Sequence, residues 1–227
     1  MNSISREETK TLMSGKSVEK GGFKHYMLKE IHEQPTVIGE TLKSFIDPHD
    51  RNIVFPEMNF DFKEIQKLSI IACGTSSYAA MVAKNWFEKY ANIPTEVDIA
   101  SEYRYRSHAH VDNEAVIVIS QSGETADTLA ALNNAKKRNI KTLAIINVME
   151  SSISRIADAS VLTLAGPEIG VASTKAFTTQ LATLACLVLF ASDERNTMSK
   201  ESIIKLVEDL LGLPCLLYTS PSPRDRG

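Results

Sequence analysis

The chain has 227 residues, of which 43% are hydrophobic, 23% charged and 7% aromatic, a composition that excludes a collagenous, coiled-coil or wholly disordered protein. Its net charge of −3 argues against a nucleic-acid-binding protein, because such proteins normally carry a basic surface. Cys73, Cys186 and Cys215 form neither a disulfide framework nor a CxxC metal pair, and no strongly apolar run reaches the roughly 20 residues of a membrane span, so we expect a soluble cytoplasmic protein with no metal and no membrane partner.

The N-terminal part of the chain divides into two stretches. Residues 1–22 are polar and have no sustained apolar period, which predicts a linker or mobile arm. Residues 25–46 carry apolar side chains close to helical spacing, although Pro35 should end one helix or start another. We expect a single domain over 23–214 that begins with this helical segment.

The middle of the chain alternates short apolar runs with helical patterns. Most of the runs are almost continuously apolar, as expected of parallel strands that are covered on both faces. The alternation predicts an α/β fold, a three-layer, doubly wound, five-stranded parallel sheet. The expected strands are 68–73, 95–99, 115–120, 142–147 and 159–164, and the expected helices are 77–90, 101–105, 125–138, 152–158 and 174–190.

The end of the chain departs from this pattern. A last amphipathic helix is expected from 200 to about 211, and residues 215–227 then become rich in proline and serine. Residues 215–225 match one reading frame of a common transposase sequencing adapter. Our hypothesis is that the natural sequence stops near Pro214 and that 215–227 is an adapter-derived, non-native tail; the alternative is a natural flexible C-terminus.

Three loops near expected helix starts are small and rich in hydroxyl groups: 73–77, 120–125 and 170–174. The N-terminus of a helix has unpaired N–H groups and a partial positive charge, so it attracts anions, and serine and threonine hydroxyls add further donors. Ligands of such sheets bind beyond the carboxyl ends of the strands, where these loops should meet. The loops therefore predict a site for a phosphate with a polar body attached.

Two other interpretations of these loops must be weighed. Serine and threonine are also the preferred N-cap residues, so each loop taken singly could be a simple helix cap. A nucleotide site is poorly supported, because no GxGxxG follows the first strand and no GxxxxGK[ST] occurs in the chain. Three hydroxyl-rich loops at one sheet edge favour the phosphate site over three unrelated caps.

The same loops carry a family resemblance. ACGTS at 72–76, SQSGETADTLAAL at 120–132 and EIGVASTKAFTTQL at 168–181 resemble the sugar isomerase (SIS) domain family, which implies a flavodoxin-like or Rossmann-like sheet. More narrowly, EKGGFKHYMLKEIHEQP at 19–35 and ASEYRYR at 100–106 are similar to the first SIS domain of glutamine–fructose-6-phosphate aminotransferases. The resemblance extends over about 19–214.

The resemblance implies that a sugar phosphate, fructose 6-phosphate or glucosamine 6-phosphate, lies against the three loops. Ser120, Ser122 and Thr125 would give hydroxyls to the phosphate, and Gln121 would donate through its amide. No cofactor is implied, and the parent enzymes are expected to be homodimers. The full set of implied substrate-binding residues is Thr75, Ser76, Ser120, Gln121, Ser122, Thr125, Val171 and Ser173.

The same family implies that catalysis lies outside this chain. Its cysteine nucleophile belongs to a glutaminase domain, and its glutamate base, Schiff-base lysine and ring-opening histidine belong to a second SIS domain and the C-terminal tail. None of these has a counterpart here, and Cys73 and Cys186 are expected to be core thiols. We therefore expect the substrate-binding half of an aminotransferase isomerase module, without turnover of its own.

The charged residues beside the loops leave other functions open. Glu168 is the best in-chain candidate for a catalytic base, while Glu124 is expected to offset a helix dipole. Lys175 should pair with Glu124 or face solvent. The rival functions are a stand-alone single-domain sugar-phosphate isomerase with Glu168 as base, and a non-catalytic sugar-phosphate sensor.

Overall fold

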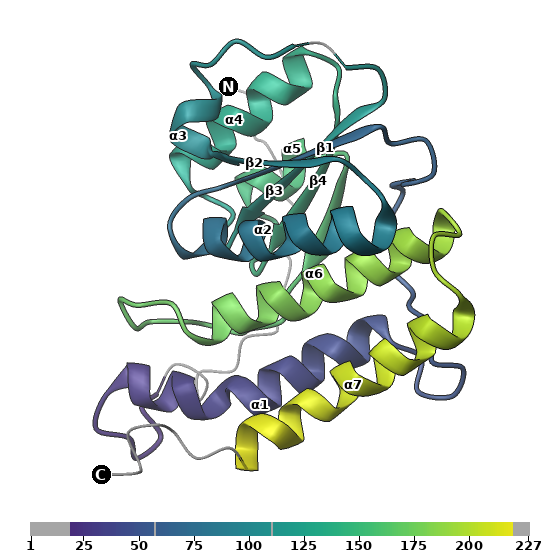
Figure 1. The fold of residues 1–227 in the computed structure, drawn as a ribbon. Helices are drawn as coiled ribbons and strands as arrows, with labels where there is room; N and C mark the ends of the chain where they lie inside the picture. Colours follow the sequence, from purple (N-terminus) through teal and green to yellow (C-terminus); the bar gives the residue numbers. More distant parts are fainter. Residues whose placement is uncertain (1–18, 57, 110, 220–227) are drawn as a thin grey trace, which may run out of the picture.

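The computed structural model describes residues 19–56, 58–109 and 111–219, so most of the expected arm 1–22 and residues 220–227 of the expected tail lie outside the described part of the chain. A five-stranded parallel sheet stands at the centre, in the order β2-β1-β3-β4-β5 (Figure 1). This is the flavodoxin-like doubly wound order, and the predicted α/β class is confirmed. The strands are β1 (Lys67–Ala72), β2 (Thr95–Ile99), β3 (Glu114–Ser120), β4 (Lys141–Ile146) and β5 (Ala159–Leu162).

Helices cover both faces of the sheet (Figure 1). Every residue of β3 is buried, which explains the unbroken apolar run at 115–119 within it. Successive side chains alternate between two cores: Ile117 and Ile119 face one helical layer, and Val116 and Val118 face the other. The first layer holds α2 (Thr75–Trp86), the π-helix η2 (Phe87–Ala91) and α6 (Lys175–Glu194), and the second holds α3 (Ala100–Tyr103), α4 (Ala126–Lys137) and α5 (Ser152–Ile156).

Two further helices, α1 (Tyr26–Phe45) and α7 (Lys200–Thr219), lie side by side against α6 (Figure 1). The expectation that Pro35 would end or begin a helix is wrong, because Pro35 lies inside α1. A proline inside a helix costs about 3 kcal/mol. Burial of Ile38, Leu42 and Phe45 against the core offsets that cost, since packing supplies most helical stability in proteins.

Helix α7 is longer than the sequence pattern predicted. It was expected to end near 211, but it continues through Pro214 to Thr219. Pro214 packs against α1 at Gly39, where a built Cβ would lie 3.7 Å from the proline Cγ. The segment 215–219 thus continues the helix, and its adapter origin stays a hypothesis.

Helix α6 is long and apolar enough, by length and composition, to cross a membrane, contrary to the expectation that no run would qualify. In this structure 67% of its apolar window is buried inside the fold. The helix packs against α1, α2 and η2, so its apolar sequence is accounted for by its place in the core.

Candidate functional site

The first two loops lie at the point where the strand order reverses. β1 is paired with β2 on one side and with β3 on the other, so the loops after β1 and β3 leave neighbouring strands at the carboxyl edge of the sheet. In open α/β sheets this reversal creates the crevice in which ligands bind. The loop after β1 leads into α2 through Gly74, and the loop after β3 leads into α4 through Thr125.

A close contact fixes the shape of the loop after β3. Gly123 has a φ of +67°, and a Cβ built on it would lie 2.1 Å from Ser151 Oγ. Its N–H donates to Ser120 Oγ over 3.1 Å, and that hydroxyl lies 2.9 Å from Thr125 Oγ1. Ser122 Oγ accepts a hydrogen bond from the backbone N–H of Glu124. These contacts draw three of the predicted phosphate ligands into one tight turn.

The hydroxyls of these two loops do not cap the helices that follow. Neither Gly74 at the start of α2 nor Thr125 at the start of α4 provides a side-chain cap. Elsewhere the chain does use serine in this way, since Ser151 accepts from the N–H of Ser154 and caps α5. Because α2 and α4 begin without a side-chain acceptor, their N-termini can bind an anion through first-turn N–H groups other than that of Ser77, which donates to the Gly74 carbonyl over 3.0 Å.

The segment 166–174, which contains the third loop, is tied to the second loop by Asn147, which follows β4. The Asn147 backbone N–H donates to the Gln121 carbonyl over 3.2 Å. Its side-chain Nδ2 donates to the Gly166 carbonyl over 2.8 Å, and its Oδ1 accepts from the Ala165 N–H over 2.7 Å. Asn147, the residue that follows the buried strand β4, thus holds both loops at the same edge of the sheet.

Glu168 caps α6. Its carboxylate accepts hydrogen bonds from the backbone N–H groups of Thr174 and Ala176, at 2.8 and 3.1 Å, and from the Ser173 hydroxyl at 3.1 Å. A general base needs a free lone pair within reach of the substrate proton. The geometry therefore gives Glu168 a capping role and disfavours it as the in-chain base.

Helix α1 supports the third loop from the other side. The Glu30 side chain is buried and accepts from the N–H groups of Ile169 and Gly170, at 2.6 and 3.0 Å. One turn along, Glu33 pairs with the buried Lys175 at 2.8 Å. The expectation that Lys175 would pair with Glu124 or face solvent is wrong, because α1 packs over it and supplies the counter-charge.

Comparisons with known proteins agree with this architecture. Residues 61–190 match the family model described as the SIS domain. The chain belongs to the SIS domain family.

The similar proteins point to one subgroup of SIS proteins. The chain is 49% identical over 217 residues, 95% of its length, to a glutamine–fructose-6-phosphate aminotransferase of Bradyrhizobium diazoefficiens, and 46% identical to that of Zymomonas mobilis over 90% of its length. It spans about a third of these relatives, 36% and 34%. The C-terminal domain of a glucosamine-fructose-6-phosphate aminotransferase from Francisella tularensis superposes with a TM-score of 0.83 at 46% identity, over 88% of this chain and 56% of that one.

A more distant neighbour shares the fold alone. Glucosamine-6-phosphate deaminase from Thermotoga maritima superposes with a TM-score of 0.62 at 22% identity, over 81% of this chain and 53% of that one. The predicted resemblance to SIS domains and to the aminotransferases is confirmed.

The predicted site residues of the SIS domain occupy different environments. Thr75 and Ser76 form the first turn of α2, and the Ser76 hydroxyl accepts a hydrogen bond from the Gln180 side chain of α6. Ser173 donates to Glu168, and Val171 projects fully into solvent. Their contacts with a ligand stay predictions.

Glu124 has a different role from the one expected. Its carboxylate accepts from the Ser152 N–H at 2.7 Å, so it acts on α5 rather than on α4, which follows it directly. The backbone hydrogen bond from Ser152 lowers the pKa of Glu124. The side chain therefore stays ionised and links the second loop of the SIS domain to the next helix.

The cysteines and histidines of the SIS domain offer no competing centre within the described residues, where no cluster of three or more His, Cys, Asp and Glu side chains could hold a metal. Burial raises the pKa of the Cys186 thiol to about 12, and Cys73 is half-buried. His108 bonds to the Tyr103 carbonyl at 2.8 Å. His110 lies outside the described residues.

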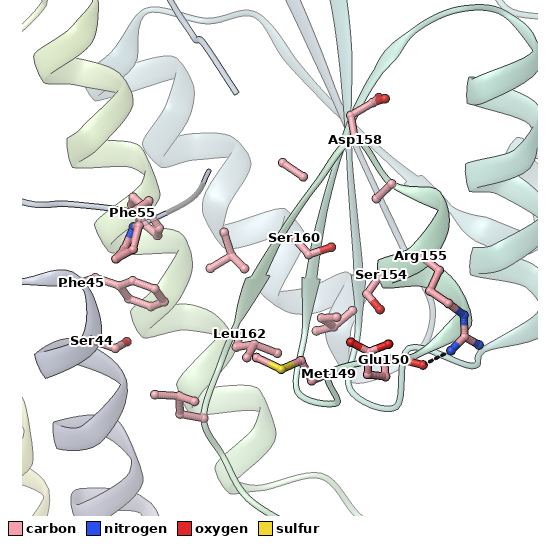
Figure 2. A pocket seen from close by; sticks show the side chains of 16 residues that line it. Ser44, Phe45, Phe55, Met149, Glu150, Ser154, Arg155, Asp158, Ser160 and Leu162 are labelled. Carbon is pink, nitrogen blue, oxygen red and sulfur yellow. Dashed lines mark hydrogen bonds between the residues drawn. The ribbon is translucent and has the colours of Figure 1, made fainter. Parts of the chain in front are cut away.

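A cavity of about 530 Å³ lies along β5, and none of the predicted site residues line it (Figure 2). Figure 2 shows Phe45 and Phe55 on one side and the strand residues Ser160 and Leu162 on the other. β5 pairs with β4 alone, so this hollow marks the free edge of the sheet rather than the switch point between β1 and β3.

Proposed function

We propose that this SIS domain is the sugar-phosphate-binding half of the isomerase module of a glutamine–fructose-6-phosphate aminotransferase. The observation that carries the proposal is the pair of helices α2 and α4, which begin without a side-chain cap beside hydroxyl-rich loops at the strand switch point. The high identity to relatives of that name supports fructose 6-phosphate or its product glucosamine 6-phosphate as the ligand.

The phosphate is proposed to lie at the start of α4. Ser122 and Thr125 would donate hydroxyl hydrogens to it, supported by the first-turn N–H groups of that helix. Ser120 is buried and already bonded within the loop, so it also keeps Thr125 in place. Gln121 would donate from its amide.

The sugar would lie between the first and third loops. Thr75 and Ser76 would close one side of the ligand, while Val171 and Ser173 would lie near the sugar. The exposure of Val171 supports this arrangement, because an apolar side chain that projects into solvent gains stability when a ligand covers it.

In the whole enzyme, ammonia released from glutamine would add to the carbonyl of fructose 6-phosphate, and the resulting imine would isomerise to glucosamine 6-phosphate. This chain would hold the substrate and leave proton transfer to other parts of a homodimeric, cytoplasmic parent protein. The commitment of Glu168 to capping α6 supports that division, because it leaves the third loop without a free carboxylate. No cofactor, membrane or nucleic acid enters the proposal.

The test is a calorimetric titration of the purified chain with fructose 6-phosphate. The double variant Ser122→Ala, Thr125→Ala should weaken binding by roughly 1–3 kcal/mol, because it removes two donors to a charged group. Ser202→Ala, which removes an exposed hydroxyl from α7, should leave the dissociation constant unchanged. An unchanged constant in the double variant, or no binding by the wild-type chain, would contradict the proposal.

The rival function of a stand-alone isomerase makes a separate prediction. The purified chain would interconvert an aldose phosphate and a ketose phosphate, and Glu168→Gln would abolish the turnover. We expect no turnover by the wild-type chain. Turnover that depends on Glu168 would mean that the capping carboxylate leaves α6 during catalysis.

A further inference from the structure

Gln180 connects the long helix α6 to the first loop of the proposed site. The residue is 3% exposed, and its Nε2 donates to Ser76 Oγ over 3.0 Å, across 104 residues of sequence. Its other polar atom, Oε1, is buried and has no hydrogen-bond partner among the described residues. The amide therefore uses one half of its hydrogen-bonding capacity, and that half is directed at a residue of the site.

The direction of this hydrogen bond determines what Ser76 can do. A serine hydroxyl has one hydrogen to donate and two lone pairs that accept. Because the Gln180 amide donates to one lone pair, the hydroxyl hydrogen of Ser76 must point elsewhere. A phosphate or sugar oxygen needs a donor, and Ser76 lies in the first turn of α2 beside the proposed ligand.

The unpartnered Oε1, together with the hydrogen bond from the same amide to Ser76, argues against a purely structural role for Gln180. A buried polar atom without a partner costs about 1–3 kcal/mol, and an apolar side chain of similar length would avoid that cost. A residue that served packing alone would be expected to be apolar, as most of its neighbours on α6 are. Such a cost is typical of residues that are kept for function at the expense of stability.

We propose that Gln180 is a positioning residue, which fixes the Ser76 hydroxyl as a hydrogen-bond donor toward the sugar phosphate. The inference rests on the proposed function of the same site, and it adds a residue of α6 to those that determine affinity. Gln180 acts through Ser76 and does not itself need to touch the ligand.

The test combines Gln180→Met with Ser76→Ala in a double-mutant cycle, read by titration with fructose 6-phosphate. Ser76→Ala should weaken binding by about 10-fold, the usual effect of one hydrogen bond, and Gln180→Met should weaken it to a similar extent. The double variant should bind no more weakly than Ser76→Ala alone, since Gln180 has nothing left to orient.

Thermal unfolding separates positioning from structural damage. Gln180→Met should unfold at the same temperature as the wild-type chain or at a higher one, because it removes a buried unpartnered acceptor. Thr183→Val is the matched control, since Thr183 lies one turn further along α6 and its buried hydroxyl also has no partner among the described residues. This control should bind fructose 6-phosphate as the wild type does.

The outcomes distinguish this inference from the proposed function. If the wild-type chain binds and the two substitutions weaken binding by independent factors, about 100-fold together, the inference is wrong and the proposed function stands. The inference is also wrong, and the proposed function still stands, if Gln180→Met binds fructose 6-phosphate as tightly as the wild-type chain. If the wild-type chain does not bind fructose 6-phosphate at all, both are overturned.

Discussion

The contact between Gly170 and Glu30 makes a quantitative prediction for Gly170→Ala. A Cβ built on Gly170 would lie 2.4 Å from Glu30 Oε2, far inside van der Waals contact, while the next nearest atoms are 3.5 Å away. The carboxylate would have to withdraw, although it is 2% exposed and bonded to the loop backbone. The substitution therefore acts through Glu30 rather than through the backbone of residue 170, which does not have a positive φ.

The magnitude follows from the hydrogen bonds that the withdrawal breaks. Glu30 accepts from the Gly170 N–H at 3.0 and 3.2 Å and from the Ile169 N–H at 2.6 Å. A hydrogen bond to a charged group contributes about 1.5–3 kcal/mol, so Gly170→Ala should lower the free energy of unfolding by about 2 kcal/mol. In a Glu30→Ala background the same methyl group meets no carboxylate, and the further loss should fall to about 0.5 kcal/mol or less.

The measurement is urea denaturation followed by the fluorescence of Trp86, the single tryptophan of the chain. Gly212→Ala in α7 is the matched control, because a Cβ there meets no atom within 4 Å. It should stabilise the chain by about 0.5–1 kcal/mol, the usual helical preference for alanine over glycine. Equal losses from Gly170→Ala in both backgrounds would refute the reasoning.

Three further predictions concern other parts of the fold. Gly123→Ala should destabilise the chain by at least about 2 kcal/mol in urea, because its Cβ would overlap Ser151 at a φ of +67°, and Ser151→Gly should recover part of that loss. Burial alone would raise the pKa of the Asp158 carboxyl, but hydrogen bonds from Lys136 and Thr142 hold it below 3.8. The stability that Asp158 confers should therefore be complete above that value and vanish as the pH falls through the lower folded-state pKa, so the difference between wild type and Asp158→Asn in urea should narrow in acid. Because its pKa is about 12, the Cys186 thiol should resist alkylation at about pH 8 until the chain unfolds, as mass spectrometry of the modified peptide can show.

The fold could be predicted because its central strands β1, β3 and β4 are buried on both faces. β3 is buried along its whole length, and its short apolar run is typical of a strand in a covered parallel sheet. The prediction of a helix boundary at Pro35 was wrong because it considered only the local cost of proline in a helix. The packing that offsets this cost comes from α6, which lies far along the chain. The π-helix at Phe87–Ala91 continues an ordinary helical pattern, so nothing in the composition of that segment sets it apart.

The sequence predicted which loops form the candidate site, but not which residues hold those loops in place. Hydroxyl-rich composition at strand ends identified the loops after β1 and β3. The partners that shape the three loops of the site, Asn147, Gln180 and Glu30, lie on other elements and depend on tertiary contacts that no spacing reveals. Glu168 illustrates the ambiguity, because an acidic residue in the loop before a helix fits both a catalytic base and a cap. Only its four hydrogen bonds decide between them.

The unit that builds the third loop is larger than the segment that the family model matches. That segment covers 61–190, and α1 lies before it. Ordering each residue of an irregular loop costs about 1–2 kcal/mol in backbone entropy, so a loop such as 166–174 needs anchors. Three side chains anchor this loop. Glu168 ties it to the start of α6, Asn147 ties it to the end of β4, and Glu30 of α1 holds its middle. Since Val171 directly follows the residues that Glu30 holds, α1 determines where this part of the proposed sugar site lies.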